Sequence, residues 1–475
     1  MQIDMHEQRH DQHAVSDFSE QIHTAAYSVH GLTLLRGILA HDAGQSILRL
    51  LQQLAATQPE PIATAEAYSE AFNQLALAMY ENATDTLIDA WQAYLIGQLI
   101  DDRNLWSTQV EDLGVERISP RLRIQAEHDL QTLQRLFKLD AQLIWEQTCA
   151  IVTPTMPELG NAWIPWHDLQ PRRDETINHA RQTLTQTIAA SSDWKELIAP
   201  LEHYWSRYGT GPFSHYHVLR WQGNKQQLEG IAHPDVIQLS DLIGQERQQA
   251  RITANVERFI AGLPAHDMLL YGAPGTGKSS TVKAIANAYA EQGLCLLEIN
   301  KEHVDDLPLI VAELRGRAPH YLLFIDDLSF EENETSYKKL KVLLEGTSET
   351  RPKNVAICAT SNRMNLIREN FNERGNPTDD VNWRDTMDEK QSLAHRFGLR
   401  VTFLSPDQKQ YLRIVKELAQ KRHIHISEDD LHSRAMQWER QHAGRSGRSA
   451  RQFVDDLEAE LKYIQPISVT EIAHS

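Results

Sequence analysis

Two patterns of apolar and polar positions divide this chain. In the first, apolar residues recur every three or four positions, and Gly and Pro are sparse, over residues 32–56, 63–100, 122–151 and 176–199. This period is typical of amphipathic helices. The pattern therefore predicts a mostly α-helical N-terminal module over residues 1–205, in which we expect the polar first 25 residues to be mobile.

The second pattern consists of short apolar runs separated by helical stretches. These runs are MLLY at 268–271, LCLLEI at 294–299, YLLFI at 321–325 and VAICAT at 355–360. Buried runs of this length joined by helices predict a parallel sheet in an α/β domain, which we place at 235–404. The preceding segment, 206–234, is rich in Gly, aromatic and turn residues and predicts a linker with a short hairpin. The helical period returns in 405–475 and predicts a C-terminal helical lid.

Composition adds constraints on partners and location. The chain has 47 basic and 65 acidic residues and a net charge of −18. Residues 1–200 contain 13 basic and 27 acidic residues, so this part alone carries 13 − 27 = −14. Such charge gives no support for non-specific binding to nucleic acid or to an anionic membrane, although a local basic groove is compatible with it. Three cysteines without a CxxC pair, and no apolar run long enough to span a bilayer, lead us to expect a cytoplasmic protein without a membrane partner.

The strongest chemical signal is GAPGTGKS at Gly272–Ser279. It fits the pattern G-x-x-x-x-G-K-[ST] and lies between an apolar run and a helical stretch, which is the context that the pattern requires. The backbone N–H groups of such a loop, and the helix N-terminus after it, bind phosphate oxygens. We expect Lys278 to bridge the β- and γ-phosphates of ATP and Ser279 to give its hydroxyl to Mg²⁺. The predicted nucleotide contacts in this loop are Gly272, Ala273, Pro274, Gly275, Thr276, Gly277, Lys278, Ser279 and Ser280.

Two carboxylates follow the apolar run YLLFI. We expect Asp326 to hold Mg²⁺ and Asp327 to polarise the attacking water. This second role is more often given to Glu, so the shorter Asp327 must approach more closely or act through another water. The alternative is a buried strand followed by an Asp that caps the next helix.

A polar residue after the next apolar run can reach the γ-phosphate or the attacking water. In CATSNR, at Cys358–Arg363, our first candidate is Asn362 and our second is Thr360. The alternative is a Ser-Asn pair that only forms a turn.

Three arginines are candidates for sensing the phosphate. Arg396 precedes the expected last strand, and an arginine there can project into a neighbouring subunit's site and offset the charge that develops during transfer. Arg448 and Arg451 lie three residues apart on one flank of the last helix, so either can contact nucleotide from the lid, and Arg448 is our first choice. A surface ion pair for Arg396, and a plain basic surface for the other two, are the alternatives.

The segment His6–His10 matches H-E-x-x-H, a pattern found in zinc proteases. A catalytic zinc site also needs a third ligand and a dry environment, whereas this segment lies among Gln, Arg and Asp near the chain start. We therefore do not expect a zinc site there.

Taken together, these motifs resemble an AAA+ P-loop ATPase. LSDLIGQERQ at 239–248 resembles the segment that such proteins place beside adenine, which implies contacts from Ile243 and Gly244. The phrasing of about residues 205–465 is similar to one bacterial AAA+ group, the domain-of-unknown-function family 815. The resemblance implies a parallel sheet of five strands in the order 5-1-4-3-2, a C-terminal helical lid, and a homo-oligomer in which Arg396 acts as the arginine finger. The family name implies no biological role.

Our hypothesis is an AAA+ ATPase that binds and hydrolyses Mg-ATP to remodel a macromolecular client, bound through the N-terminal helical module. One alternative is an ATP-gated binding switch that turns over slowly, which the Asp at 327 keeps open. Another is a P-loop kinase of a small molecule, although no Arg-rich lid within the core is evident.

Overall fold

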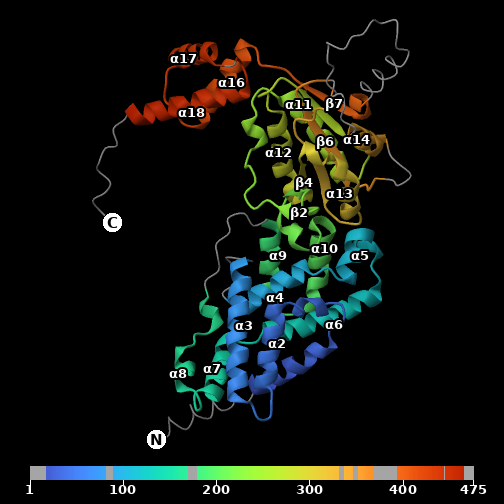
Figure 1. The fold of residues 1–475 in the computed structure, drawn as a ribbon, viewed down its shortest axis with the longest axis vertical. Helices are drawn as coiled ribbons and strands as arrows, with labels where there is room; N and C mark the ends of the chain where they lie inside the picture. Colours follow the sequence, from blue (N-terminus) through green and yellow to red (C-terminus); the bar gives the residue numbers. More distant parts are fainter. Residues whose placement is uncertain are drawn as a thin grey trace. The chain divides into compact units, whose positions relative to one another are not determined.

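The computed structural model describes residues 18–81, 89–169, 179–330, 336–345, 351–364, 366, 393–442 and 444–464. The chain forms two compact units (Figure 1). Unit 1 comprises Met1–Tyr216 with Gly316–Pro319, and unit 2 comprises His217–Arg315 with His320–Ser475. The boundaries predicted at 205, 234 and 404 between the helical module, the linker, the α/β core and the lid stay a prediction. The H-E-x-x-H segment lies outside the described residues.

Unit 1 is built of helices, as the period of its apolar residues predicts. After a helical segment at 18–28, its α-helices are α2 (Asp42–Leu54), α3 (Pro61–Glu81), α4 (Ala90–Asp101), α5 (Leu105–Leu113), α6 (Pro120–Phe137), α7 (Ala141–Val152), α8 (Pro157–Ala162), α9 (His179–Ala190) and α10 (Ile198–Tyr208). Side chains cap several N-termini; for example, Asn104 accepts hydrogen bonds from two backbone N–H groups at the start of α5. Mobility was predicted for residues 1–25, but Phe18 and Ile22 are buried in the helical core, so that prediction is corrected from residue 18 onward.

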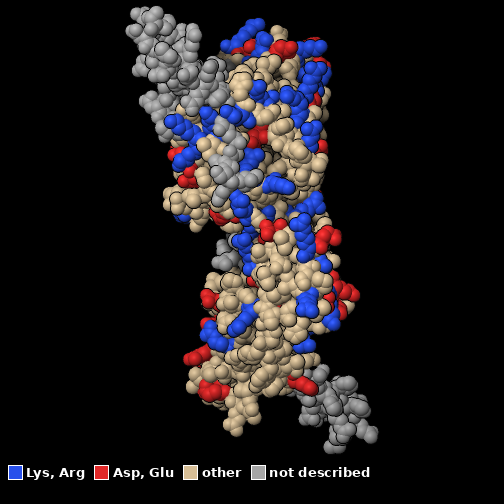
Figure 2. Space-filling view, turned by 90° about the vertical axis from the view of Figure 1, so that its right-hand side faces the viewer, with Lys and Arg blue, Asp and Glu red and all other residues tan. Residues whose placement is uncertain are grey.

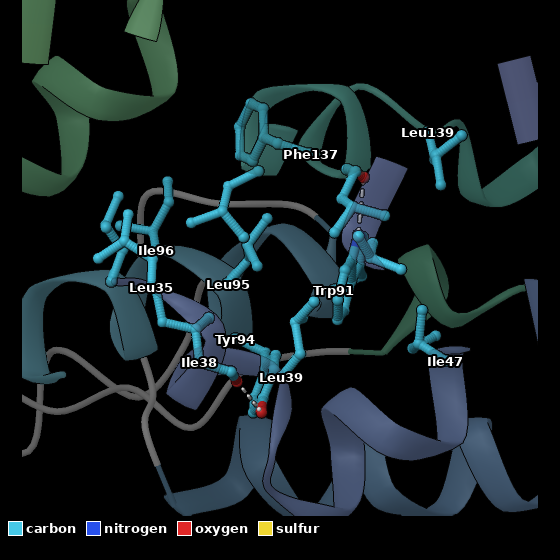
Figure 3. Packing of buried hydrophobic residues seen from close by; sticks show 14 of the residues in the cluster. Leu35, Ile38, Leu39, Ile47, Trp91, Tyr94, Leu95, Ile96, Phe137 and Leu139 are labelled. Carbon is cyan, nitrogen blue, oxygen red and sulfur yellow. Dashed lines mark hydrogen bonds between the residues drawn. The ribbon is translucent and has the colours of Figure 1, made fainter. Parts of the chain in front are cut away.

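The core of unit 1 combines aliphatic residues with large aromatic ones (Figure 3). Several of the aromatic residues also find a hydrogen-bond partner inside the core. The Trp91 indole N–H donates to the Leu136 carbonyl at 2.8 Å, and the Tyr94 hydroxyl donates to the Ile38 carbonyl at 2.9 Å. Buried Trp and Tyr usually find such a partner, because an unpaired polar atom in the core is costly. These bonds connect α4 to segments distant in the sequence.

Buried carboxylates in unit 1 are surrounded by donors. The Glu111 side chain, 1% exposed, accepts hydrogen bonds from the N–H and hydroxyl of Thr210 and from the Ala318 N–H, and forms an ion pair with Arg317 at 3.2 Å. Gly316–Pro319 group with unit 1, although they lie between a helix and a strand of unit 2 in the sequence. Four donors on one carboxylate compensate for its burial.

Unit 2 contains a seven-stranded sheet in the order β2-β1-β4-β5-β6-β3-β7. Its strands are β1 (Val218–Gln222), β2 (Gln227–Gly230), β3 (Met268–Gly272), β4 (Leu294–Ile299), β5 (His320–Ile325), β6 (Val355–Ser361) and β7 (Leu399–Phe403). All neighbours pair in parallel except β1 and β2. The four apolar runs found in the sequence coincide with β3, β4, β5 and β6, which confirms the predicted α/β fold.

The sheet has two strands more than the resemblance implies. Strands β3, β4, β5, β6 and β7, taken as 1 to 5 along the chain, follow the order 5-1-4-3-2 within it. The added strands form a hairpin in the segment predicted as a linker, and β1 pairs in parallel with β4, the outermost of the five core strands on that side. The hairpin is therefore part of the sheet.

Helices α11 (Glu246–Ile260) and α12 (Lys278–Tyr289) pack on one face of this sheet. Their apolar residues, such as Val256 and Ile285, form one cluster with Leu270 and Phe324 of the strands. Two more helices of the α/β part are α13 (Leu307–Leu314) and α14 (Ser336–Glu345).

Basic and acidic side chains are interspersed over the face that Figure 2 shows.

The predicted lid consists of α16 (Gln408–Lys421), α17 (Glu428–Gln441) and α18 (Gly447–Ile464). They share an apolar cluster that contains Val415, Leu431 and Val454, and also Ile243 of the segment before α11. Within the described part of the chain, no helix has the length and apolar character needed to cross a membrane.

Candidate nucleotide-binding site

The phosphate-binding loop connects β3 to α12, as the sequence predicts. Gly275 and Gly277 have positive φ values of 76° and 90°, where a side chain would be strained. A Cβ at Gly277 would also lie only 2.6 Å from the Gln245 amide. The loop therefore needs glycine at these positions for its backbone to turn into the N-terminus of α12.

Lys278 points back into the loop. Its ammonium donates hydrogen bonds to the carbonyls of Gly272 (2.8 Å) and Ala273 (2.9 Å) and to the Asn362 amide oxygen (3.1 Å). Burial lowers the pKa of Lys278, and the nearby carboxylates of Asp327 and Asp326 act in the opposite direction. A cation held at the centre of the loop can exchange these acceptors for phosphate oxygens.

The two carboxylates lie at the carboxyl end of β5. The Ser279 hydroxyl donates to Asp326 Oδ1 at 2.6 Å, and the Thr360 hydroxyl donates to the same oxygen at 2.5 Å. The Asn362 amide N–H donates to Asp327 Oδ1 at 2.7 Å. Because β6 lies between β3 and β5, its end brings Asn362 between the loop lysine and the second carboxylate.

These groups open into a cavity of about 570 Å³. One end is polar and contains the loop, both carboxylates and Asn362. The other end is apolar and lies between the segment 242–244 and the lid, with Leu242, Ile243, Leu404, Pro406, Ile414 and Leu418 in its wall. A polar end next to an apolar one suits a ligand with a phosphate chain at one side and a flat base at the other.

The lid contributes arginines and a polar contact to the cavity. Arg448 and Arg451 both line it, and the Arg448 backbone N–H donates to the Gly275 carbonyl at 3.3 Å. Gln410 of α16 donates from its side-chain amide to the Gly244 carbonyl at 2.7 Å. The lid therefore contacts both the loop and the segment predicted to lie beside adenine.

Most of the predicted site residues line this one cavity. They are Ile243, Gly244, Pro274, Gly275, Thr276, Gly277, Lys278, Ser279, Ser280, Asp326, Asp327, Asn362, Arg448 and Arg451. Gly272 and Ala273 do not line it but accept hydrogen bonds from Lys278. Arg396 is exposed and is not part of the cavity wall. The functional roles of all these residues stay predictions.

Sequence reasoning did not select several residues of the cavity wall. Gln245 donates to the Thr276 carbonyl and accepts a hydrogen bond from the Thr281 hydroxyl. Gln410, Ile414 and Leu418 recur every four residues on α16, so their shared face was available as a signal. Nothing local in the sequence indicates that this face lies against Gly244.

The donor set at the end of β5 fits magnesium. Mg²⁺ prefers hard oxygen ligands, and proteins hold it through one or two carboxylates together with phosphate oxygens. A serine hydroxyl and a carboxylate 2.6 Å apart, with a second carboxylate next in sequence, supply such oxygens beside the loop. Ser279 and Asp326 are therefore the residues that would hold the ion.

The fold is that of a P-loop ATPase of the AAA+ class. Its five parallel core strands have the strand order of that class. The phosphate-binding loop follows the first core strand, the carboxylates follow the third, and the helical lid follows the last. Within this class the chain belongs to the family described as protein of unknown function, DUF815, whose model matches residues 214–461.

Comparison with solved structures finds AAA+ proteins at low similarity. The Thermotoga maritima RuvB Holliday junction branch migration motor is 17% identical over 48% of this chain and 66% of its own, with a TM-score of 0.35. The FIGL-1 AAA domain in complex with ADP is 18% identical over 50% of this chain and 76% of its own, with a TM-score of 0.34. The chain thus matches slightly less than two thirds of RuvB. No curated protein matches it.

Proposed function

We propose that unit 2 binds Mg-ATP in this cavity and hydrolyses the bond to the γ-phosphate. One observation carries the proposal: hydrogen bonds connect Lys278, Asn362 and Asp327, although the three residues come from three separate segments of the chain. The helical lid lines the same cavity, so a change in the nucleotide can reach it directly.

The residues at the polar end of the cavity have separate roles in the proposed reaction. Lys278 binds the β- and γ-phosphates, and Ser279 and Asp326 hold Mg²⁺, which when bound neutralises phosphate charge. Asp327 accepts a hydrogen bond from the attacking water and polarises it, and Asn362 orients that carboxylate and the water. Arg448, or Arg451, contacts the phosphates from the lid.

The test of nucleotide binding compares two lysines of α12. Replacing Lys278 by Ala removes the cation within the loop, whereas Lys283→Ala removes a half-buried lysine of the same helix that pairs with Glu298 of β4. Charge-assisted hydrogen bonds contribute about 1.5–3 kcal/mol each, so ATP affinity measured by calorimetry should fall at least about tenfold in Lys278→Ala. The Lys283→Ala variant should bind ATP as the parent does.

Near-normal affinity in Lys278→Ala would exclude this loop as the ATP site.

Free phosphate should be released by the parent protein in the presence of Mg²⁺. A phosphorylated small molecule formed without free phosphate would instead support the kinase alternative.

We also propose that Arg396 acts on a neighbouring subunit of a homo-oligomer. It is exposed and absent from the wall of its own cavity, which agrees with action in trans. Specific activity should then rise with protein concentration until assembly is complete. Arg396→Ala should bind ATP normally and hydrolyse it poorly, while Arg258→Ala, an exposed arginine of α11, serves as the control.

Mixing two inactive variants tests this arrangement. Assemblies that contain Arg396→Ala and Lys278→Ala chains include interfaces with an intact loop from the first chain and an intact arginine from the second. Partial recovery of hydrolysis on mixing is the expected result. No recovery, with co-assembly confirmed by pulldown, would contradict action in trans.

A second candidate, a slowly cycling ATP-gated switch, is favoured by one contact. Asn362 already binds Asp327 at 2.7 Å, and a carboxylate engaged in this way is a poorer partner for water. Multiple-turnover measurements on the assembled protein separate the two: a switch binds ATP tightly and releases phosphate slowly, whereas a motor turns over continuously.

The helical module of residues 1–205 is our proposed binding site for a macromolecular client. The hydrolysis-blocked variant Asp327→Asn should hold the client in the ATP state. A pulldown with this variant, compared in ATP and ADP, should enrich the same client only in ATP and only when the module is present.

A further inference from the structure

Thr360 lies between the two carboxylates of the site. It is the sixth residue of β6, is 1% exposed and lines the cavity. Its hydroxyl donates to Asp326 Oδ1 at 2.5 Å and accepts a hydrogen bond from the Asp327 backbone N–H at 2.9 Å. Its carbonyl accepts a third hydrogen bond, from the Leu328 N–H at 2.7 Å.

The direction of these bonds decides what the hydroxyl can do. A threonine hydroxyl has one proton to donate, and an ionised carboxylate can only accept. The proton is therefore given to Asp326, and a lone pair is used by the Asp327 N–H. The hydroxyl has no second proton for the γ-phosphate or for water, which differs from the role that the sequence suggested for Thr360.

The backbone at Asp327 explains why such a residue is needed. Asp327 has a φ of 50°, in the left-handed region that few residues other than Gly adopt. The N–H groups of Asp327 and Leu328 both donate to Thr360, one to the hydroxyl and one to the carbonyl. These bonds hold the chain on both sides of the unusual conformation and so fix the direction in which the Asp327 carboxylate leaves the backbone.

Thr360 also helps to hold the side chain of Asp326. The hydroxyls of Thr360 and Ser279 both donate to Oδ1. Ser279 lies in the first turn of α12 and would give its hydroxyl to magnesium when nucleotide binds, whereas Thr360 belongs to a central strand of the sheet. Thr360 thus keeps Oδ1 in place and would hold Asp326 in the orientation in which it binds Mg²⁺.

We propose that Thr360 is a positioning residue whose hydroxyl aligns both carboxylates, setting the direction of Asp326 toward magnesium and that of Asp327 toward the attacking water. This inference rests on the proposed ATPase function. It concerns a hydroxyl whose single proton is given to Asp326, so it adds a separate requirement to that function.

The test compares variants at adjacent buried positions of β6 in the full-length protein. Thr360→Val keeps the shape and removes the hydroxyl, Thr360→Ser keeps the hydroxyl and removes the methyl group, and Ser361→Ala removes a neighbouring buried hydroxyl. Groups that orient metal ligands typically change metal affinity or activity by about 10- to 100-fold when removed. The measurements are ATP affinity without Mg²⁺, the Mg²⁺ concentration for half-maximal nucleotide binding, and the single-turnover rate of hydrolysis.

Thr360→Val should bind ATP without Mg²⁺ as the parent does, require about tenfold more Mg²⁺ and hydrolyse ATP about 10- to 100-fold more slowly. Thr360→Ser should restore the rate and the Mg²⁺ dependence to within a few-fold, and Ser361→Ala should match the parent. A normal rate and Mg²⁺ dependence in Thr360→Val would overturn the inference. So would a Thr360→Ser variant as defective as Thr360→Val, because the methyl group would then be responsible.

Failure of the inference and failure of the proposed function give different results. If the parent does not hydrolyse ATP, the proposed function fails, and the Mg²⁺ dependence of nucleotide binding still tests Thr360. If Thr360→Val does not fold, Thr360→Ala and Thr360→Ser are compared by the same Mg²⁺ titration. A parent that hydrolyses ATP, with Thr360 variants equal to it, would overturn only the role of Thr360.

Discussion

Two pairs of carboxylates, one from each unit, differ in how far protein donors occupy them. In unit 1, Glu111 and Glu202 are nearly inaccessible, and donors occupy both oxygens of each. In unit 2, Asp326 and Asp327 are exposed at the end of β5, and the side-chain hydrogen bonds that they accept from described residues fall on Oδ1 of each. A carboxylate whose two oxygens both accept hydrogen bonds from the protein stabilises the fold. A carboxylate beside a cavity, with fewer protein donors, can also bind a metal ion or water.

The physical reason lies in the cost of burial. An ionised carboxylate taken out of water must be compensated by hydrogen bonds and a cation, and in unit 1 Arg123 and Arg317 provide the cations. Asp326 and Asp327 keep access to solvent, so they need fewer protein donors. The comparison predicts that changes in unit 1 affect folding, and that changes at the end of β5 affect chemistry.

The largest expected effect is on hydrolysis by Asp327→Asn. This change keeps the size of the side chain but removes the charge that polarises water, and general-base contributions are typically about 10²- to 10⁴-fold. Turnover should fall by about this factor, while ATP binding and the unfolding midpoint stay close to those of the parent. Full turnover in Asp327→Asn would show that another residue activates the water.

The next effect tests the opposite half of the comparison, in unit 1. The buried Glu202 accepts hydrogen bonds from the Trp106 indole and from Arg123, so Glu202→Gln leaves Arg123 facing an amide donor. We expect a loss of about 2–3 kcal/mol in the free energy of unfolding, since a broken buried pair is costly but Arg123 is partly exposed. Urea unfolding can be followed by fluorescence, to which the buried tryptophans of unit 1 contribute.

Glu70→Gln in the same unit is the control for this prediction. The Arg49–Glu70 pair is 54% and 41% exposed, and such surface pairs contribute about 0–1 kcal/mol. Equal losses of unfolding free energy in the two variants would contradict the distinction between saturated, buried carboxylates and exposed ones.

A smaller effect is expected on magnesium affinity from Asp326→Asn. An amide is a weaker ligand than a carboxylate for a hard cation, so the Mg²⁺ needed for nucleotide binding should rise about tenfold or more. Stability should change little because Asp326 is exposed. Titration of Mg²⁺ at fixed ATP measures this effect, and an unchanged Mg²⁺ dependence would place the ion elsewhere.

The smallest effect separates the two lid arginines. Within the described residues Arg448 takes part in no ion pair, unlike Arg123 of unit 1, and its backbone lies against Gly275 of the loop. Arg448→Gln should weaken ATP binding by about 1–2 kcal/mol, as expected for one charged hydrogen bond. Arg451→Gln should weaken it less, because its charge lies near Asp241. The reverse order of ATP affinities would assign the phosphate contact to Arg451.

The sequence alone determined the parts of this protein that depend on local spacing. The loop Gly272–Ser279 and the carboxylates after YLLFI are continuous in the chain, so their patterns could be recognised directly. Period and run length likewise identified the helices of unit 1 and the strands β3 to β6. The strand order came from resemblance, because pairing between distant strands leaves no local pattern.

Tertiary structure decided which distant residues meet. The position of β6 between β3 and β5 places Thr360 between Asp326 and Asp327, and the fold of the lid brings Gln410 to Gly244. The grouping of Gly316–Pro319 with unit 1 depends on Glu111, about two hundred residues earlier. A threonine in a strand and a glutamate in a helix look ordinary in a sequence. Their roles arise only when folding removes them from water and leaves each polar atom the partners that the surrounding chain can supply.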